Sequence, residues 1–570
     1  MSITPQAALT QRLRAALTAC GLPPERGDVV AAADTRFGDY QANAAMVLAK
    51  EAKRNPRELA AQIAEKFDGG DMCAKPEIAG PGFLNFRLEP GWVSRQLGIL
   101  SADARCGAPE SEKRRKIIVD FSSPNIAKPM HVGHIRSTIL GDALSRIARF
   151  LGHEVVTDNH LGDWGTQFGK VLYGWKHLLD RAALERDPVA EMTRLYREVN
   201  AIEQTDPAVH KAAREELVKL QQGDPENRAI WQQLVDLSWA EFGEIYGHLG
   251  IRFDERLGES FYDPALAALV EKLLADGVAE ISEGAVCVFF RDIPALADKP
   301  CLIRKSDGGF LYATTDLATI EYREERWEPD AIWYVTGAPQ QLHFQQVFSA
   351  ARRMGYSTKL EHIAFGSILG EDHKLMKTRS GDNVPLRALL DEAVTRARAM
   401  IDEKNPEMPE EEKKHIARVV GLGAVKYAEL SQHRMTDYVF SWSKMLSLQG
   451  NTAPYLQNAY VRVRSIFRKL GTELGAAENI FLTEPAELAL AKKLLQFGEV
   501  VPTVLHEFRP NLLANYLFET ANAFHAFYEA CPVLKAEGPA RHSRLVLCDT
   551  TARVLRQGLE LLGVEVPERM

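Results

Sequence analysis

Several features of membrane, secreted and metal-binding proteins are missing from this sequence. No stretch of about 18 apolar residues occurs, so a transmembrane helix is not expected. The first segment, "MSITPQAALTQRLRAALTAC", is amphipathic but lacks the apolar centre of a secretory signal. The seven cysteines are scattered and none form a CxxC pair, so neither a disulfide framework nor a zinc site is expected. This cysteine usage is typical of the reducing cytoplasm.

The sequence also lacks an excess of basic charge. Its formal net charge of −8 argues against a protein that binds nucleic acid over most of its surface, but not against one that binds RNA through local basic patches. With 46% hydrophobic and 26% charged residues, the composition is that of a globular protein with a sizeable core. At roughly 100–200 residues per domain, the 570 residues predict three or four domains.

Residues 1–110 are predicted to form a small α+β domain. Helical patterns at 5–21 and 55–67 precede "EIAGPGFLNFRL", which is interpreted as two strands broken by Gly80-Pro81-Gly82. The polar, turn-rich stretch "RCGAPESEKRRK" that follows is typical of a linker.

A buried strand, "KIIVDF", opens a second region. A loop, the helical pattern "HIRSTILGDALSRIARFLG" and another strand in "HEVVTDNHLGDWG" follow it. Strand, helix and strand at this spacing predict a βα unit of a parallel sheet. Residues from about 175 to 290 are charged and mostly helical and are interpreted as an insertion. Strand-like runs in "GAVCVFF", "AIWYVTG" and "HIAFGSIL" predict that the sheet then resumes, and beyond about residue 390 the pattern is almost entirely helical.

Two histidines stand at the start of the helix in this second region, within "DFSSPNIAKPMHVGHIRS". His131 and His134 are three residues apart and share one helix face, and Gly133 between them would let a flat ligand approach closely. Pro129 suits an early helical position. The free N–H groups and the helix dipole favour a phosphate there. Two ordinary histidines at the edge of the core are the alternative, and a metal pair lacks a nearby third ligand.

A second stretch, "GEDHKLMKTRSGDNV", is a glycine- and lysine-rich loop. Such a loop could cradle the β and γ phosphates of a nucleotide. A solvated surface loop has the same composition, so this motif alone does not decide between the two.

These motifs together resemble a known family. "HVGH" after a buried strand resembles the HIGH signature of class I aminoacyl-tRNA synthetases. The wider stretches "SSPNIAKPMHVGHIRSTILGDALSR" and "NHLGDWGTQFG" resemble the arginyl-tRNA synthetases, of bacterial type. The resemblance covers nearly the whole chain and is weakest in the insertion.

The resemblance implies an α/β fold with three parts. A Rossmann-like catalytic domain with a parallel sheet is expected at 111–390, and an N-terminal α+β domain that contacts tRNA at 1–110. A C-terminal all-α domain that includes the anticodon-binding part is expected at 391–570. The implied reaction activates L-arginine with ATP to arginyl adenylate, releases pyrophosphate, and transfers arginine to the 3′ end of its tRNA.

The resemblance also assigns an ATP site. It implies that His131, Gly133 and His134 bind ATP, and that the lysine-rich loop is the family's KMSKS loop. The loop contributes Met376, Lys377, Thr378 and Arg379. Thr378 stands where other class I enzymes have a second lysine, and Lys128, just before the HIGH motif, is the expected catalytic substitute. His131 and His134 are the other expected catalytic residues.

An arginine site is implied in the same way. In "FLYATTDLA", Tyr312 and Asp316 lie at i and i+4, and the resemblance assigns both to the guanidinium. A helix-stabilising acid is the alternative for Asp316. The remaining arginine-binding residues that the resemblance implies are Asp120, Ser122, Asn125, His134 and Gln340, although Gln341 is adjacent to the last of these.

The C-terminal region supplies candidate RNA contacts. In "GNTAPYLQNAYVRVRSIFRKLG", an apolar stripe leaves Arg464 and Arg468 on the outer face for phosphates, and Tyr455 could stack on a base. A solvated basic face and a core tyrosine are the alternatives.

The expected partners are tRNA, L-arginine and ATP with Mg²⁺, with no tightly bound metal or organic cofactor and no membrane. A cytoplasmic monomer is expected. A small-molecule ATP ligase and a non-catalytic RNA-binding paralogue are the competing interpretations. The long helical C-terminal region argues against the ligase, and the intact histidine motif argues against the paralogue.

Overall fold

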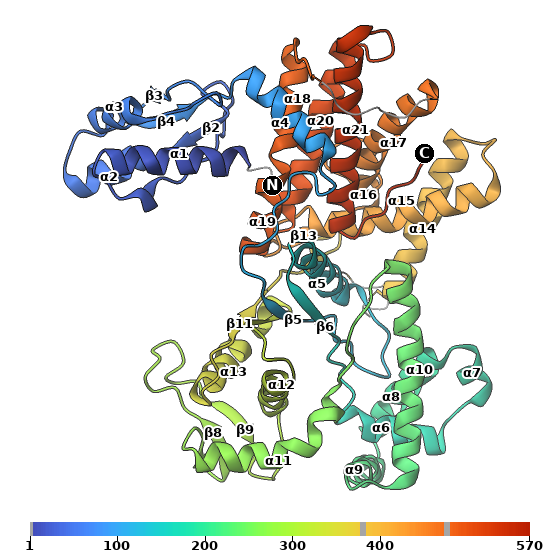
Figure 1. Ribbon diagram of the computed structural model, residues 1–570. Helices are drawn as coiled ribbons and strands as arrows, with labels where there is room; N and C mark the ends of the chain where they lie inside the picture. The colour runs from blue at the N-terminus through green and yellow to red at the C-terminus, as the bar shows by residue number, and fades with distance from the viewer. Residues whose placement is uncertain (1–3, 375, 377–383, 472–478) are drawn as a thin grey trace. The chain divides into compact units, whose positions relative to one another are not determined.

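The computed structural model describes residues 4–374, 376, 384–471 and 479–570. The chain forms two compact units (Figure 1). Residues 111–446 make one unit, and residues 1–110 together with 447–570 make the other. The second unit is therefore discontinuous in sequence, because the whole of the first unit is inserted between its two parts.

A four-stranded parallel sheet lies at the centre of the 111–446 unit. Its order is β11-β10-β5-β6, and its strands are β5 (Lys116–Phe121), β6 (Glu154–Asp158), β10 (Ala331–Val335) and β11 (Lys359–His362). All five residues of β10 are buried, as are five of the six in β5. Strands buried on both faces need helices on both faces. The predicted parallel sheet and its first βα unit, with α5 (Val132–Phe150), are thereby confirmed.

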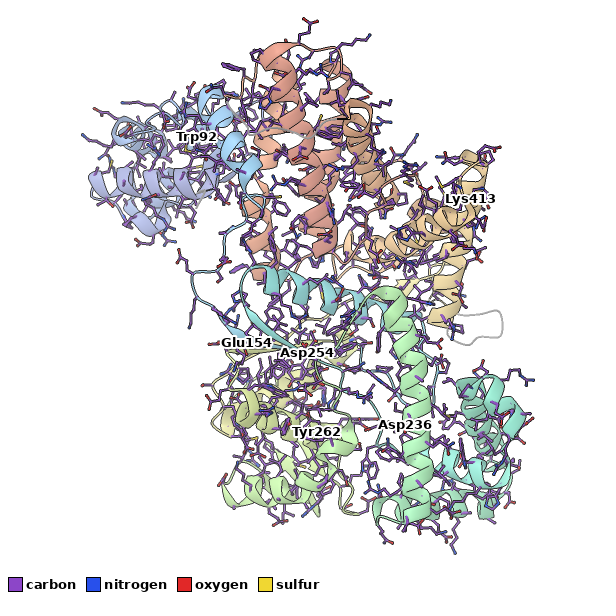
Figure 2. The ribbon with its side chains drawn as sticks, turned by 45° about the vertical axis from the view of Figure 1, so that its right-hand side comes forward. Trp92, Glu154, Asp236, Asp254, Tyr262 and Lys413 are labelled. Atoms are coloured by element: carbon purple, nitrogen blue, oxygen red, sulfur yellow. The ribbon has the colours of Figure 1, made fainter. Side chains whose placement is uncertain are left out.

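A long helical segment separates β6 from the rest of the sheet. It comprises α6 (Gln167–His177), α7 (Arg181–Arg186), α8 (Pro188–Ile202), α9 (Pro207–Gln221), α10 (Pro225–Leu249) and α11 (Glu259–Ala275). Asp254, labelled in Figure 2, fixes the chain as it returns to the sheet edge: its Oδ2 accepts hydrogen bonds from the Thr157 amide at 2.9 Å and from Arg149 at 2.6 Å. The helical pattern predicted for residues from about 175 to 290 is confirmed as far as Ala275.

The expectation that "GAVCVFF" rejoins the parallel sheet is wrong. This segment contains β8 (Ala285–Val288), which pairs antiparallel with β7 (Glu280–Ser282) and β9 (Cys301–Arg304) in a separate three-stranded sheet. Glu283 and Gly284 connect β7 to β8, with φ of 50° and 79°. Two consecutive positive φ angles make the tight turn that joins antiparallel neighbours, so the local turn decides the pairing.

The sheet resumes after this hairpin. Helix α12 (Tyr312–Trp327) leads to β10, and the short η2 (Ala338–Gln340) and α13 (Gln341–Arg353) lead to β11. Beyond β11, "HIAFGSIL" ends in β12 (Ile368–Leu369), which leaves the central sheet and pairs with β13 (Tyr438–Val439).

Helices α14 (Leu386–Lys404) and α15 (Glu410–Leu430) pack against each other and on α5, and α16 (Trp442–Met445) follows them. The compact unit therefore ends at residue 446, whereas the sequence placed a boundary at 390. The difference arises because both helices pack on α5 and so belong to the 111–446 unit.

The other unit combines an antiparallel sheet with helices. The sheet order is β1-β2-β4-β3, with β1 (Val30–Ala31), β2 (Tyr40–Ala42), β3 (Glu77–Ala79) and β4 (Phe83–Phe86). Its N-terminal helices are α1 (Pro5–Ala19), η1 (Pro24–Arg26), α2 (Ala44–Ala52), α3 (Pro56–Lys66) and α4 (Pro90–Ala102). The predicted α+β arrangement and the strand pair around the Gly-Pro-Gly break are confirmed.

The C-terminal part of this unit is helical, as predicted. Its helices are α17 (Ala453–Leu470), α18 (Pro485–Leu495), α19 (Phe497–Glu507), α20 (Asn511–Ala530) and α21 (Gly538–Leu561). Helix α4 packs on α18 and α21. The carboxylate of Glu499 in α19 accepts hydrogen bonds from the Tyr40 hydroxyl at 2.9 Å and the Gln6 amide at 2.8 Å, and thereby joins the two sequence segments.

Candidate active site

The loop between β5 and α5 is held in an unusual backbone conformation. Ser122, Ser123 and Ala127 have φ of 73°, 47° and 60°, a region in which each non-glycine residue costs about 1–3 kcal/mol. Hydrogen bonds from elsewhere fix the loop, since the Ala127 amide donates to Ser238 of α10 at 3.0 Å. The Ser122 hydroxyl lies 2.8 Å from that of Tyr246, also in α10. The insertion therefore shapes the loop that precedes the histidine motif.

The two histidines cap α5 reciprocally. His131 is the N-cap residue and its Nδ1 accepts from the Gly133 amide at 3.0 Å, while Nδ1 of His134 accepts from the His131 amide at 3.1 Å. Because each Nδ1 is an acceptor, the proton of each neutral ring resides on Nε2. The ring centroids lie 4.0 Å apart. The pair thus presents two N–H donors at the positive end of a helix.

Both imidazoles are neutral at neutral pH. Burial lowers the pKa of His134 to about 4, with a further contribution from the neighbouring His131. Burial also lowers the pKa of His131. Gly133 is needed between them, because a Cβ atom there would lie 2.8 Å from the ring of His131. The site therefore offers hydrogen bonds to an anion rather than two positive charges.

The lysine-rich loop returns to the histidine motif. The Val132 amide donates to the Val384 carbonyl at 2.9 Å, and the Leu386 amide donates to the Met130 carbonyl at 2.8 Å. At the other end of the loop, the half-buried Met376 donates its amide to Ile368 at 3.4 Å. The expected ATP ligands Lys377, Thr378 and Arg379 lie outside the residues that the structure describes.

Lys128 contacts the insertion. Its ammonium lies 5.1 Å from the ring centroid of Tyr196 in α8, and Lys170 lies 5.7 Å from the same ring. A second lysine and an aromatic ring therefore surround the expected catalytic cation.

Asp120 belongs to a buried charge cluster beneath the loop. Its Oδ2 accepts from Arg323 at 2.7 Å, and its Oδ1 accepts from the Ser123 hydroxyl at 3.1 Å. Arg323 is fully buried and also contacts Asp158 at 2.8 Å. Ser122 is buried as well, and its hydroxyl hydrogen-bonds within the core. Asp120 therefore has a structural partner of its own, in addition to any substrate contact.

Asn125 and Gln340 are exposed at the same edge of the sheet. Asn125 follows β5 and Gln340 follows β10, and these strands are parallel neighbours. Ligands of parallel sheets bind at the carboxyl ends of the strands. The two amides are therefore available to a ligand at that edge.

Tyr312 and Asp316 lie on the first two turns of α12. Tyr312 is 70% exposed, while the Asp316 carboxylate is largely shielded and lies 2.5 Å from Nε2 of His343 in α13. The first residue of α11, Glu259, faces the same region. Its pKa is raised to about 7 by burial and by the negative charges of Asp163 and Asp316, against an opposing effect of His160. This acidic group is suited to a cation.

Glu259 and His343 were missed in the sequence. His343 could have been found, because it follows Gln340 by three residues and so shares a helix face with it. Glu259 has no such local signal, since it reaches the site from the far end of the insertion. Among the described residues, no group of three or more His, Cys, Asp or Glu side chains could hold a metal ion.

The expected RNA contacts lie in the other unit and have partners there. The Tyr455 hydroxyl contacts Asn522 at 2.6 Å and His525 at 2.8 Å. Arg468 donates to the Glu568 carbonyl at 2.8 Å, and Arg464 lies 3.8 Å from Asp549. To bind RNA, each of these three side chains would have to give up its contact within the protein.

Three family models match the chain. Their descriptions are "Arginyl tRNA synthetase N terminal domain" for residues 7–88, "tRNA synthetases class I (R), catalytic domain" for residues 97–442, and "DALR anticodon binding domain" for residues 456–570.

Individual relatives match over their full length. Arginine–tRNA ligases of Synechococcus elongatus and Thermobifida fusca are each 46% identical to the chain, covering 99% of it and 100% of the relative. The solved structure of arginyl-tRNA synthetase from Thermus thermophilus matches with a TM-score of 0.84 at 28% identity, over 99% of this chain and 100% of that one. That from Plasmodium falciparum matches with a TM-score of 0.83 at 28% identity, over 100% of both chains.

Proposed function

The chain belongs to the arginyl-tRNA synthetases of class I and is an ATP-dependent arginine–tRNA ligase, and from this premise we propose how its residues carry out the reaction. Its substrates are arginine, ATP and tRNA. In the first step, the carboxylate of arginine attacks the α-phosphorus of ATP, and pyrophosphate leaves. In the second step, a hydroxyl at the 3′ end of tRNA attacks the arginyl carbonyl, and AMP leaves.

The histidine pair would bind the phosphates of ATP. The observation that carries this proposal is the reciprocal cap, which leaves the Nε2–H group of both His131 and His134 as a donor beside the N-terminus of α5. Preorganised donors of this kind stabilise the charge that grows on a phosphate in the transition state. Lys128 would add a positive charge from the preceding loop. We propose that Mg²⁺ enters with the ATP phosphates, which supply its oxygen ligands.

Arginine would bind along the same sheet edge. Asp316 and Glu259 carry the negative charge that a guanidinium requires, and the exposed Tyr312 lies one helical turn from Asp316. Asn125 and Gln340 would hold the α-amino and carboxylate end near the phosphates. Asp120 would act through Ser123 and Arg323, which it already contacts.

We further propose a division of labour along the chain. Residues 111–446 would contain both chemical steps, residues 1–110 would contact the body of the tRNA, and residues 447–570 would contact its anticodon region. All seven cysteines are free thiols, which suits a reducing cytoplasm. None of the described helices has the length and apolar character needed to span a membrane. A monomer would suffice, since every residue assigned to the chemistry comes from one chain.

ATP–pyrophosphate exchange with His134→Gln tests the phosphate assignment. A glutamine keeps a polar side chain but cannot cap α5 and donate to a phosphate in the same geometry. We expect the exchange rate to fall by about 10²-fold or more, with the arginine KM little changed. The control is His177→Gln, a histidine of α6 to which no role is assigned here. An exchange rate within twofold of the wild-type rate for His134→Gln would remove the histidine pair from the mechanism.

A further inference from the structure

His343 forms a hydrogen bond with the Asp316 carboxylate, the group that we assign to the substrate guanidinium. It lies in the first turn of α13, and its Nε2 is 2.5 Å from Oδ2 of Asp316 in α12. An ionised carboxylate only accepts hydrogen bonds, so Nε2 carries a proton in this contact. The two side chains are 30% and 18% exposed, so solvent screens the contact only in part.

The charge on His343 depends on this contact. Burial lowers the pKa of His343, but the hydrogen bond and the negative charge of Asp316 outweigh burial and raise it above the ordinary histidine value. His362, the titratable neighbour from β11, is neutral at neutral pH because burial lowers its pKa to about 4. The acidic form of His343 is therefore an imidazolium paired with Asp316.

Other titratable groups face Asp316 from the elements packed around it. Burial raises the pKa of Cys301 in β9 to about 12 and that of Tyr334 in β10 still further, so both are neutral. Glu259 from α11 is acidic and titrates near pH 7. Two groups around Asp316 therefore change charge with pH: Glu259, whose pKa is about 7, and His343, whose pKa is raised above its ordinary value.

We propose that arginine binding is linked to the loss of a proton from His343, because the imidazolium and the substrate guanidinium compete for the charge of Asp316. The inference rests on the proposed assignment of Asp316 to the guanidinium. A guanidinium keeps its charge at every accessible pH, so of the two cations only His343 can give up its charge. A carboxylate has lone pairs for both partners, but two cations that share it repel each other.

His343 is thus a positioning residue that also senses pH. In its neutral form it keeps the Nε2–H hydrogen bond and holds Asp316 in place without adding charge. The released proton goes to solvent when arginine binds. At one pH unit below the pKa of His343, the competing proton raises the apparent KM for arginine by about tenfold. The effect on kcat is small, because the guanidinium does not take part in bond making.

The test compares the wild-type enzyme with His343→Gln. Glutamine is neutral at all pH values and its amide N–H can replace the imidazole donor to Asp316. The KM for arginine is measured in tRNA charging between about pH 6 and pH 8, the range in which histidine titrates. We expect KM to rise more steeply toward acid pH in the wild type, so that at the acid end the variant has the lower KM by severalfold.

A second readout counts protons directly. Arginine is titrated calorimetrically into the enzyme–tRNA complex in two buffers that differ in ionisation enthalpy. The wild type should release more protons per arginine than His343→Gln near the pKa of His343. Glu259 titrates in both proteins, so the difference between them reports His343.

Two results would overturn the inference. One is an unchanged pH profile of KM in His343→Gln. The other is a higher KM than wild type at the acid end, which would mean that His343 only orients Asp316. If His343→Gln does not fold, His343→Asn is measured in its place.

Asp316→Asn separates this inference from the assignment on which it rests. An arginine KM within twofold of wild type in Asp316→Asn would refute the assignment of Asp316 itself. A large rise in KM in Asp316→Asn, with a wild-type pH profile in His343→Gln, would refute only the proton linkage.

Discussion

At the scale of single residues, the chemistry depends on which groups carry charge at neutral pH. His131 and His134 are neutral donors, so under the proposed assignment the positive charge near the ATP phosphates has to come from other side chains. Lys128 is the candidate for this charge, because it precedes His131 by three residues. Its ammonium makes a cation–π contact with the ring of Tyr196. A cation held by a ring can move to an anion at modest cost, since such contacts are worth about 0.5–2 kcal/mol.

Lys128→Ala should therefore slow adenylate formation. We expect kcat for pyrophosphate exchange to fall by about 10²-fold, the scale of losing one preorganised electrostatic contact. The arginine KM should change little, because the cation acts mainly in the transition state. The matched control is Lys170→Ala, which removes the other lysine on the same ring. Equal losses in both variants would mean that Lys128 acts only through the packing around Tyr196.

Some contacts of the candidate site residues could be predicted from the sequence and others could not. The histidine motif was readable because its function is local: the cap, the glycine and the helix start all lie within four consecutive residues. The sequence places His343 near Gln340, but it does not show that His343 contacts Asp316, and it gives no local signal for Glu259, because the fold alone brings these two helices to Asp316. Asp120 was assigned to the substrate, but its contact with the buried Arg323 depends on a residue about 200 positions away.

At the scale of secondary-structure elements, a buried charge cluster joins α5 to its neighbours. Arg136 of α5 contacts Glu429 of α15 at 3.0 Å, and the two side chains are only 4% and 3% exposed. Glu429 also accepts a hydrogen bond from Tyr438 of β13, the strand that pairs with β12 before the lysine-rich loop. The cluster thus links α5, which carries the histidine motif, and β12, which precedes the lysine-rich loop, to α15.

Breaking this cluster should destabilise the enzyme. Arg136→Met leaves Glu429 buried without its cation, and we expect the free energy of unfolding to fall by about 3–5 kcal/mol. The double variant Arg136→Met, Glu429→Leu should recover a large part of that loss, because no charge then remains buried. Urea denaturation measures both. A double variant that is as unstable as Arg136→Met would show that packing, and not charge, dominates at this site.

Local sequence patterns predicted individual helices and strands better than they predicted which elements pack or pair with one another. Helix α17 has the apolar spacing that the sequence predicted, with Leu456, Ala459, Val463 and Ile466 buried. Strand β8 was also found, but its sheet was not, because a two-residue turn rather than its apolar content selects its partner. The 111–446 unit extends past the boundary expected at 390 for a related reason, since helical periodicity does not say which surface a helix covers.

At the scale of the whole molecule, the unit made of 1–110 and 447–570 is held together by a titratable contact. Burial raises the pKa of Glu499 to about 7, although the Gln6 amide and the Tyr40 hydroxyl donate to it. A folded pKa above the unfolded one stabilises the unit below the unfolded pKa, and this stabilisation is lost as the pH rises through 7.

Glu499→Gln should therefore change the pH dependence of stability. The glutamine oxygen can accept from Tyr40 and Gln6 without an ionisation cost. We expect the variant to be more stable than wild type by roughly 1–2 kcal/mol at about pH 8, and similar to it at about pH 5. Thermal unfolding followed at both pH values measures the difference. A variant that is less stable than wild type at both values would show that the carboxylate is needed in its charged form.

The discontinuity of this unit has a consequence for how the protein is made. Residues 1–110 leave the ribosome first, and the helices on which they pack begin only after the 336 residues from 111 to 446 have been added. At about 5–20 residues per second, that interval lasts roughly 20–70 s. During it, α4, which has four buried residues in the finished molecule, lacks the contacts that it later makes with α18 and α21. The apolar side chains of α4 are therefore at risk of aggregation in the nascent chain until residues 111–446 and the helices that follow them have been synthesised.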